Sequence, residues 1–418
     1  MSTYDDASLI YYPSGYKAGT AYSLKPTDGS GDLTFTRAST ATRVNSSGLI
    51  ESVATGVPRI DYTGGGCGKL LLEPQRTNLV IYSEEFNNWL IPPTFTAIET
   101  ASLKDSIIFS NFGNAVSQGI TLTSNADTTI SVFAKKSNWN FLQIRTVNFD
   151  ASASARTWFD LLNGTVGSTD IPSRHFNQSI EDFGGGWYRC SLTFKSITDL
   201  TGSIQLAGSQ SNSSTISGAN SGEDIFFDMS QVELGSYPTS YIPTTSTAVT
   251  RTQDSATKSG ISSLIGQTEG VLFFEFDYKK AQINTSLFDT SLNNNDNIYL
   301  IALSDFNLRM WVTVGGVNQA IISTGTIPSE GRHKAAMAYK ENDCAFYLDG
   351  VQVGVDTSCT IPTVDDLLLK TPNQNTQAFM TFPTRLSDDD LTLLTGTLGE
   401  TYFESYALMA NYLNYTVQ

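Results

Sequence analysis

The 418-residue chain has few cysteines, few histidines and few charged residues, and each shortage disfavours a class of function. Its four cysteines stand far apart without a C-x-x-C spacing, and with only two histidines the chain lacks the dense ligand cluster of a zinc site. Charged residues make up 16%, and 25 basic residues against 41 acidic ones give a net charge of −16. Such an acidic chain without a Lys/Arg run repels phosphate backbones and anionic lipid. We therefore expect no binding to nucleic acid.

Long apolar runs and targeting signals are missing as well. No segment approaches the roughly 20 apolar residues of a membrane span, so we expect no membrane insertion. The opening MSTYDDASLI has neither the basic region nor the apolar core of a signal peptide. We therefore expect synthesis in a cytoplasm without secretion through a signal peptide.

The cysteines of the chain are interpreted mainly as core residues. Cys190 and Cys344 fall inside apolar strand patterns, where buried free thiols are common. Cys344 and Cys359 could form a disulfide, but the favoured interpretation is that both stay reduced.

The chain is rich in patterns typical of β-strands. With 418 residues it is too long for one core, and 40% hydrophobic residues are enough for two or three packed domains. Alternation of apolar and polar residues predicts strands, and Asn163-Gly164 predicts a hairpin turn. The strongest strand patterns are at 129–134, 141–145, 158–161, 224–229, 270–278, 297–303 and 308–314.

Three consecutive glycines, Gly184 to Gly186, precede Trp187. A phosphate-binding loop would continue with Lys-Ser/Thr and a helix, and neither follows. The favoured interpretation is a tight bend that lets the Trp187 ring pack into a core.

Four segments of the chain are distinctive, namely F-T-R-A-S-T-A-T at 35–42, V-P-R-I-D-Y at 57–62, L-L-L-E-P-Q-R-T-N-L at 70–79, and the stretch 181–251. Together they resemble structural proteins of tailed bacteriophages. The stretch 181–251 resembles a carbohydrate-binding-module-like sandwich. The opening section, residues 1–85, contains arginines at positions 37, 43, 59 and 76. They would serve either as an assembly contact or as buried side chains bonded to backbone carbonyls, and we favour the second.

The C-terminal half carries two distinctive motifs, the Y-L-D-G hairpin at Tyr347–Gly350 and R-L-S-D-D-D-L at Arg385–Leu391, where Ser387 and Asp390 also form a sound helix start. With these motifs it resembles a laminin-G/concanavalin-A-like jelly roll. The implied fold is all-β, with tandem antiparallel β-sandwiches (jelly rolls) and a short C-terminal helix.

From these resemblances we expect five sections of the chain. They are an N-terminal β-rich attachment section at 1–85, a carbohydrate-binding-module-like sandwich at 86–250, a connector at 251–268, a jelly roll at 269–400 and a C-terminal helix at 401–418.

Catalysis is not expected. Concanavalin-A-like glycosidases carry a strand motif E-x-D-x-x-E, and Glu275 and Asp277 supply its first two acids. The position of the acid/base glutamate is occupied by Lys280. We therefore predict a protein that is not an enzyme.

Sugar binding requires less, namely an aromatic ring on a loop or sheet face with polar neighbours. Trp139, flanked by Asn138 and Asn140, is either such an exposed platform or a residue at the edge of the core. Tyr299 and Trp311 lie in strand patterns and are predicted to be core residues.

The only cofactor that the sequence suggests is calcium. Asn294 and Asp296 lie in the oxygen-rich stretch SLNNNDN, and laminin-G-like domains often bind calcium at a rim. An Asn-rich segment is more often a plain turn, so both interpretations stay open.

The resemblance implies a phage virion surface protein, of head-fibre or tail-fibre type, that attaches to glycans of the host or the environment. Weak single contacts would be multiplied by many copies. We expect other virion proteins as partners, assembly as a homotrimer, and location in the virion, which release by host lysis would allow without a signal peptide. The alternatives are a purely structural role in capsid decoration or tail assembly, and a polysaccharide depolymerase.

Overall fold

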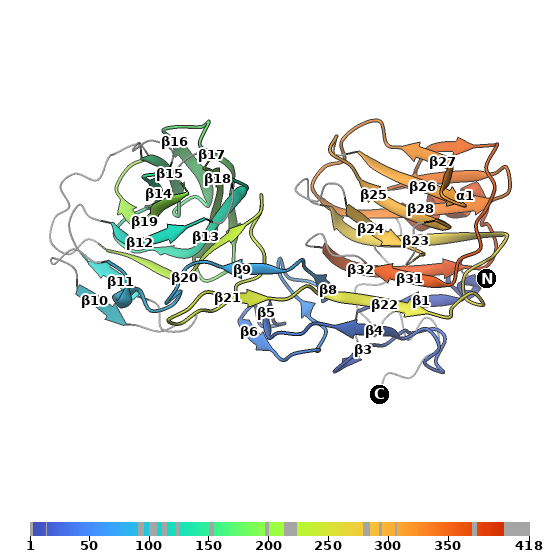
Figure 1. The fold of residues 1–418 in the computed structure, drawn as a ribbon, viewed down its shortest axis with the longest axis horizontal. Helices are drawn as coiled ribbons and strands as arrows, with labels where there is room; N and C mark the ends of the chain where they lie inside the picture. The colour runs from blue at the N-terminus through green and yellow to red at the C-terminus, as the bar shows by residue number, and fades with distance from the viewer. Residues whose placement is uncertain are drawn as a thin grey trace. The chain divides into compact units, whose positions relative to one another are not determined.

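The computed structural model describes most of the chain and divides it into two compact units. The described residues are 3–13, 15–90, 96–99, 107–110, 115–122, 125–149, 154–196, 200–212, 224–278, 285–291, 295–305, 307–369 and 374–396 (Figure 1). Unit 1 consists of Met1–Ser46, Ser52–Gln75 and Thr252–Gln418, and unit 2 of Ser47–Glu51 and Arg76–Arg251. The predicted fold class is confirmed, because nearly all described elements are antiparallel strands and one short helix, α1 (Asp388–Thr395), follows them.

Unit 1 is a sandwich of two antiparallel sheets. In order, one described sheet contains β30 (Val351–Asp356), β29 (Cys344–Leu348), β28 (Gly331–Lys340), β23 (Glu269–Tyr278), β32 (Gln374–Phe382), β8 (Lys69–Leu72) and β7 (Ile60–Asp61), and β1 (Leu9–Tyr11) also pairs with β32. The other contains β2 (Tyr16–Lys17), β3 (Thr20–Ala21), β4 (Leu33–Thr36), β22 (Ser255–Ser259), β31 (Asp366–Leu369), β24 (Thr285–Asp289), β25 (Asn297–Ala302), β26 (Leu308–Val314) and β27 (Val317–Ser323).

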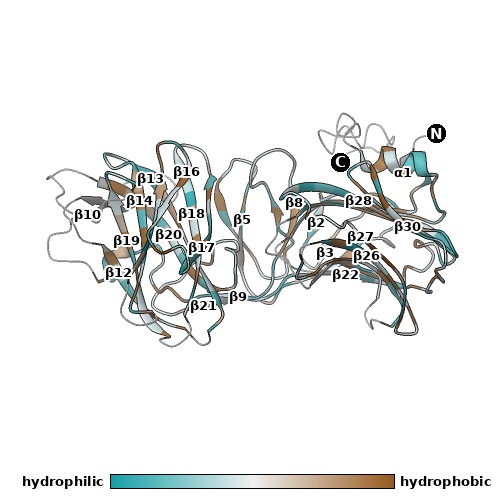
Figure 2. Ribbon diagram, turned by 90° about the horizontal axis from the view of Figure 1, so that it is seen from above, coloured by the Kyte–Doolittle hydropathy of each residue, from teal (hydrophilic) through white to brown (hydrophobic). Residues whose placement is uncertain are grey.

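Strand β23 shows how unit 1 is packed. Leu272 and Phe274 belong to the core between the two sheets, whereas Val271 and Phe273 belong to a second core on the other side of their sheet. That second core includes Leu391 of α1. Alternate residues of a strand face opposite sides, so an almost continuous apolar run indicates a strand buried on both faces. Figure 2 shows both hydrophobic and hydrophilic residues on α1, as a helix with one packed face requires.

The start of α1 was predicted correctly. Ser387 is the N-cap residue, and its hydroxyl accepts a hydrogen bond from the backbone N–H of Asp390 at 3.2 Å. The predicted helix at 401–418 lies outside the described residues. Among the residues that are described, no helix has both the length and the apolar character needed to cross a membrane.

Four buried charged side chains bind the opening section to the rest of unit 1. Arg59 forms ion pairs with Glu73, at 2.7 Å, and with Asp254, while Arg37 reaches Asp254 at 3.1 Å. Both arginines also donate to backbone carbonyls. The favoured prediction of buried, carbonyl-bonded arginines is thus confirmed for these two. Two cations balance two anions, so the cluster avoids the high cost of an unpaired buried charge.

The structure divides the chain differently from the sequence-based boundaries. Strands β1, β4, β7 and β8 of the opening section lie in the two sheets of unit 1, and β1 pairs with β32 near the other end of the chain. The expected connector at 251–268 carries β22, which lies between β4 and β31. A local pattern of residues identifies a strand but not its distant partner, which is why the sequence separated these segments.

Unit 2 is a second sandwich. Its six-stranded described sheet contains β10 (Thr96–Glu99), β11 (Ile107–Ser110), β20 (Asp224–Leu234), β13 (Asp127–Lys136), β18 (Trp187–Lys195) and β17 (His175–Asp182). Its five-stranded described sheet contains β12 (Val116–Thr121), β19 (Thr201–Ser209), β14 (Phe141–Val147), β15 (Ala155–Asp160) and β16 (Thr165–Thr169).

The remaining described elements of the chain are short. They are η1 (Thr3–Asp6), β5 (Ala41–Val44), which pairs with β6 (Ile50–Val53), η2 (Phe86–Asn88), and β9 (Arg76–Asn78), which pairs with β21 (Val249–Arg251).

The predicted turns of unit 2 are confirmed. Gly164 has φ +64° in the hairpin between β15 and β16. Gly184, Gly185 and Gly186 all have positive φ in the bend between β17 and β18, a conformation that favours glycine. Trp187, which follows the bend, is buried with Phe133, Met229 and Tyr241.

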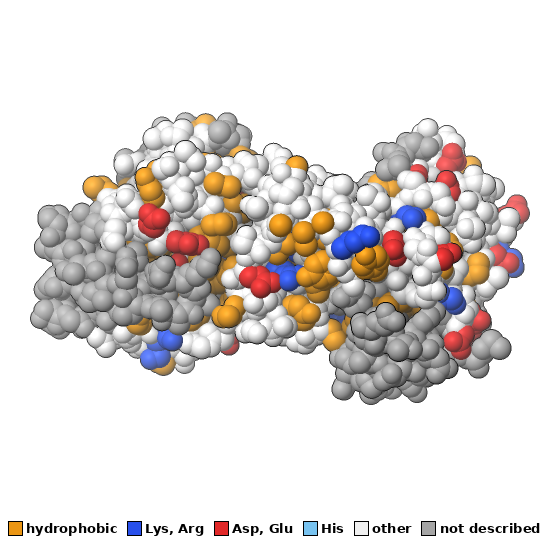
Figure 3. All heavy atoms as spheres, turned by 90° about the horizontal axis from the view of Figure 1, so that it is seen from below, with side chains coloured by type: hydrophobic (Ala, Val, Ile, Leu, Met, Phe, Trp, Pro, Cys, Tyr) orange, Lys and Arg blue, Asp and Glu red, His pale blue; other side chains and the backbone are white. Residues whose placement is uncertain are grey.

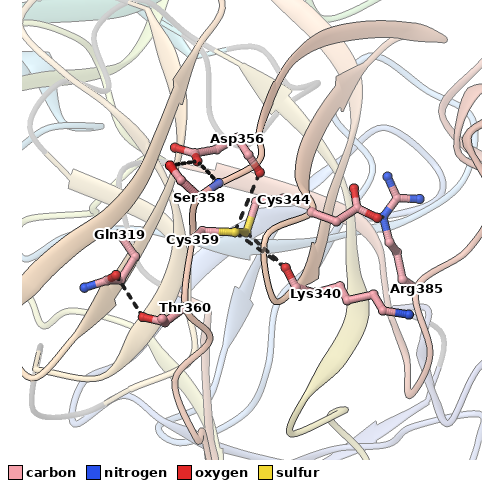
Figure 4. The surroundings of a disulfide bond; sticks show 9 residues. Gln319, Lys340, Cys344, Asp356, Ser358, Cys359, Thr360 and Arg385 are labelled. Carbon is pink, nitrogen blue, oxygen red and sulfur yellow. Dashed lines mark hydrogen bonds and ion pairs between the residues drawn. A yellow bond between two sulfur atoms is a disulfide. The ribbon is translucent and has the colours of Figure 1, made fainter.

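The structure corrects the favoured prediction that Cys344 and Cys359 stay reduced. Cys344 and Cys359 form a disulfide with their Cα atoms 6.7 Å apart, whereas Cys67 and Cys190 are free. The backbone N–H of Asn342 donates to the carbonyl of Cys359 at 2.8 Å and holds the two segments together. Figure 4 shows the surroundings, where Thr360 donates to Gln319 at 2.8 Å. The pairing depends on how β30 returns past β29, which sequence spacing does not reveal.

Candidate functional site

The structure does not support Trp139 as an exposed platform. Its side chain is only 7% exposed and belongs to the core of unit 2. Gly208 of β19 makes room for the ring, since a Cβ atom at that position would lie 1.5 Å from Trp139 Cε3. The core alternative is therefore correct. A glycan-binding role for the neighbouring Asn138 and Asn140 stays a prediction.

The predicted calcium ligands are not brought together in the described residues. Asn294 lies outside them, and the carboxylate of Asp296 accepts a hydrogen bond from the backbone N–H of Gly315 at 2.8 Å. Within the part of the chain that the structure describes, no three His, Cys, Asp or Glu side chains form a group suited to a metal ion. Calcium binding by a set that includes Asn294 stays a prediction.

The two strand carboxylates, Glu275 and Asp277, are each held by a cation. Glu275 pairs with Arg332, whose Nε lies 2.5 Å from the carboxylate. Asp277 accepts from Lys69 at 2.9 Å and from Gln377 at 2.7 Å. Lys280 lies outside the described residues. Both acids thus serve as partners in ion pairs, the structural alternative to a catalytic pair.

An aromatic pair, Tyr299 and Trp311, occupies the outer face of the second sheet of unit 1. The two residues stand directly opposite each other on β25 and β26. Their ring centroids are 5.7 Å apart and their planes differ by 13°. Both side chains are half-buried, whereas the alternating neighbours Leu300 and Met310 lie in the core. The prediction that the aromatic pair belongs to the core is therefore wrong.

Neighbouring residues fix the aromatic pair and extend its surface. The indole N–H of Trp311 donates to Asn318 Oδ1 at 2.8 Å. Burial, reinforced by the charge of Asp289, raises the pKa of Tyr299 to about 12, so its hydroxyl stays protonated at neutral pH. Ile321 of β27 is opposite Trp311 in the register and is 46% exposed. The sheet thus presents two rings, an aliphatic side chain and polar groups in one row.

A sequence signal for the aromatic pair existed. In Leu308–Val314, Trp311 stands two residues after Arg309. In Asn297–Ala302, Tyr299 stands between the apolar residues Ile298 and Leu300. Side chains at positions i and i+2 share a face, so the charge on Arg309 indicated an outward Trp311. The register that places Tyr299 opposite Trp311 could come only from the structure.

The chain matches no protein-family model, and no curated protein matches it. Among solved structures it is similar to domain 4 of AbnA, a GH43 extracellular arabinanase from Geobacillus stearothermophilus in complex with arabinotriose, at 14% identity and a TM-score of 0.29, over 34% of this chain and 73% of that one. Mouse laminin alpha1 chain domains LG4-5 match at 11% identity and a TM-score of 0.21, over 70% of this chain and 91% of that one.

A third similar structure is Trypanosoma rangeli sialidase in complex with sialic acid. It matches at 11% identity and a TM-score of 0.25, over 72% of this chain and 63% of that one. Likenesses with such low identities and TM-scores say nothing about what this chain binds or does.

Proposed function

We propose that this chain is a non-enzymatic surface protein of a tailed-phage virion and that it binds glycans through the aromatic pair, Tyr299 and Trp311. The observation that carries the glycan-binding part is two nearly parallel, half-buried rings on an outer sheet face. Aromatic rings pack against the apolar C–H faces of sugars, and nearby amide groups can bond to sugar hydroxyls. The phage part rests on the motifs of the opening section and on the stretch 181–251.

The surface composition fits this proposal. On the face drawn in Figure 3, acidic and basic side chains are scattered among a larger uncharged surface, leaving the grey atoms aside. With only 16% charged residues in the chain, hydroxyl and amide groups provide much of the polar surface. Such groups exchange hydrogen bonds with sugars at a lower desolvation cost than charged ones. A purely structural role in the virion would leave the aromatic pair without a ligand.

Replacing Trp311 tests the proposal. We expect Trp311→Ala to weaken binding of the full chain to immobilised neutral polysaccharides about fivefold, because one ring contact is worth about 1 kcal/mol. Val351→Ala is the matched control, since Val351 is 65% exposed on the other sheet of unit 1. Binding that is equal in both variants would refute the role of the aromatic pair. A wild-type chain that binds no neutral polysaccharide would favour the structural alternative.

A further inference from the structure

Two arginines are opposite each other on the five-stranded sheet of unit 2. Arg145 of β14 and Arg156 of β15 are partners in the antiparallel register, and Gln205 of β19 is opposite Arg145 on its other side. Leu142 and Ile144 belong to the alternate set of positions on β14, and they lie in the core of unit 2. The two arginines and Gln205 therefore form one row on the outer face of this sheet.

The charges of this row are only partly balanced. Asp170 accepts from Arg156 Nη1 at 2.9 Å and from the backbone N–H of Arg156 at 2.7 Å, so it is committed to that residue. The side chain of Arg145 forms no hydrogen bond or ion pair with any residue that the structure describes, and its Nε is buried without an acceptor. The indole N–H of Trp158, on the same face two residues after Arg156, is also buried without an acceptor.

This arrangement is costly for a protein that binds nothing there. Like charges directly opposite each other in a sheet are destabilising. Burial and the charge of Arg156 lower the pKa of Arg145 and outweigh the opposing charge of Asp170, but a guanidinium remains charged at neutral pH. Two donors on this face, Arg145 Nε and Trp158 Nε1, have no acceptor among the described residues, and an anion bound beside Arg145 would supply one.

We propose that Arg145, Arg156 and Gln205 form a subsite for the carboxylate of an acidic saccharide, such as a uronic acid unit. Opposite Cβ atoms in a sheet are about 4.5–5.5 Å apart, so both guanidinium groups can reach one carboxylate. Planar guanidinium forks bind planar carboxylates through two parallel hydrogen bonds. The amide of Gln205 can bond to a neighbouring sugar hydroxyl. That the anion belongs to a saccharide rests on the proposed function, but this subsite lies in unit 2 and does not involve the aromatic pair.

The test is titration calorimetry of the full chain with a polyuronate oligosaccharide. We expect Arg145→Gln to lower the affinity about tenfold, the loss of one charge-assisted contact. Lys195→Gln, which removes an equal charge from an exposed position of unit 2, should leave the affinity unchanged. Arg145→Lys keeps the charge without the fork and should bind with intermediate affinity. Without ligand, Arg145→Gln should unfold at a higher temperature than the wild type, because the repulsion is relieved.

The outcomes separate this inference from the proposed function. Equal losses in Arg145→Gln and Lys195→Gln would show unspecific attraction and overturn the subsite, as would a wild type that does not bind polyuronate. Binding of a sulfated dextran that depends on Arg145, without binding of polyuronate, would overturn the choice of a carboxylate. If Arg145→Gln fails to fold, Gln205→Ala takes its place, and unchanged affinity would count against the subsite. If polyuronate binds through Arg145 while neutral glycans do not bind, the role of the aromatic pair fails and the subsite stands.

Discussion

At the scale of single residues, the pKa values of the two histidines are shifted in opposite directions, and each unit contains one of them. In unit 2, the ring nitrogens of His175 bond to Thr146 at 2.9 Å and Thr157 at 3.0 Å, and burial lowers the pKa of His175 to about 4. In unit 1, burial of His333 opposes its protonation, but hydrogen bonds to Asp349 and to a backbone carbonyl outweigh it and raise the pKa.

The two units should therefore respond oppositely to acid through their histidines. His175 has a folded pKa below its unfolded value of 6.5, so unit 2 should lose up to roughly 3 kcal/mol as the pH falls from about 6.5 to about 4. His333 has a raised folded pKa, so its contribution is present below pH 6.5 and lost as the pH rises through the folded value.

Peptide-resolved hydrogen exchange across this pH range measures the two units separately. His175→Asn should flatten the acid loss in unit 2, and His333→Asn should flatten the loss above about pH 6.5 in unit 1. An acid loss in unit 2 that is the same in the wild type and in His175→Asn would contradict the assignment.

At the scale of strands and turns, the sequence predicts features that depend on neighbouring residues but not which distant segments pair. Alternation located the pair β25 and β26, and the glycines located the bend before Trp187, because both depend on neighbouring residues. The sequence could not show that Gly208 makes room for Trp139, or that Asp254 closes the cluster with Arg59. The orientation of Trp311 could be inferred from its alternation with Met310, but its ring partner depends on register.

The opening strands should be essential for unit 1. β8 and β4 lie inside its two sheets, and Glu73 balances part of the charge of Arg59. A chain without residues 1–75 should deprive β32 of β8 and β1, β22 of β4, and Asp254 of its arginines, so unit 1 should not fold. Breaking one partner of a buried ion pair alone costs about 3–5 kcal/mol.

Hydrogen exchange of the shortened chain checks this expectation. Amides of β23 and β28 should exchange freely, while those of β13 and β18 in unit 2 should stay protected. Native protection of β23 in the shortened chain would show that the opening section is a separate attachment module, as the sequence alone suggested.

At the scale of the whole molecule, the proposed function depends on many weak contacts acting together. A single aromatic contact gives low affinity, and repetition of the chain on a particle raises the overall binding strength. Trimers would repeat the binding faces and cover sheet edges such as β27, the last strand in its described sheet.

We therefore expect the full chain to form a homotrimer. Multi-angle light scattering should give three times the chain mass of 45.4 kDa at micromolar concentration. A mass equal to one chain at that concentration would count against the trimer, and binding would then depend on copies arranged by other virion proteins.

The indole N–H resonances of the chain test the central claim most directly. Of its five tryptophans, Trp89, Trp139, Trp158 and Trp187 are at most 7% exposed, and only Trp311 is half-buried. In a titration with a neutral polysaccharide fragment that binds, the resonance missing from Trp311→Phe should shift strongly and the other four should stay in place. Saturable binding that leaves the Trp311 resonance unmoved would contradict the assignment of the aromatic pair as the glycan-binding site.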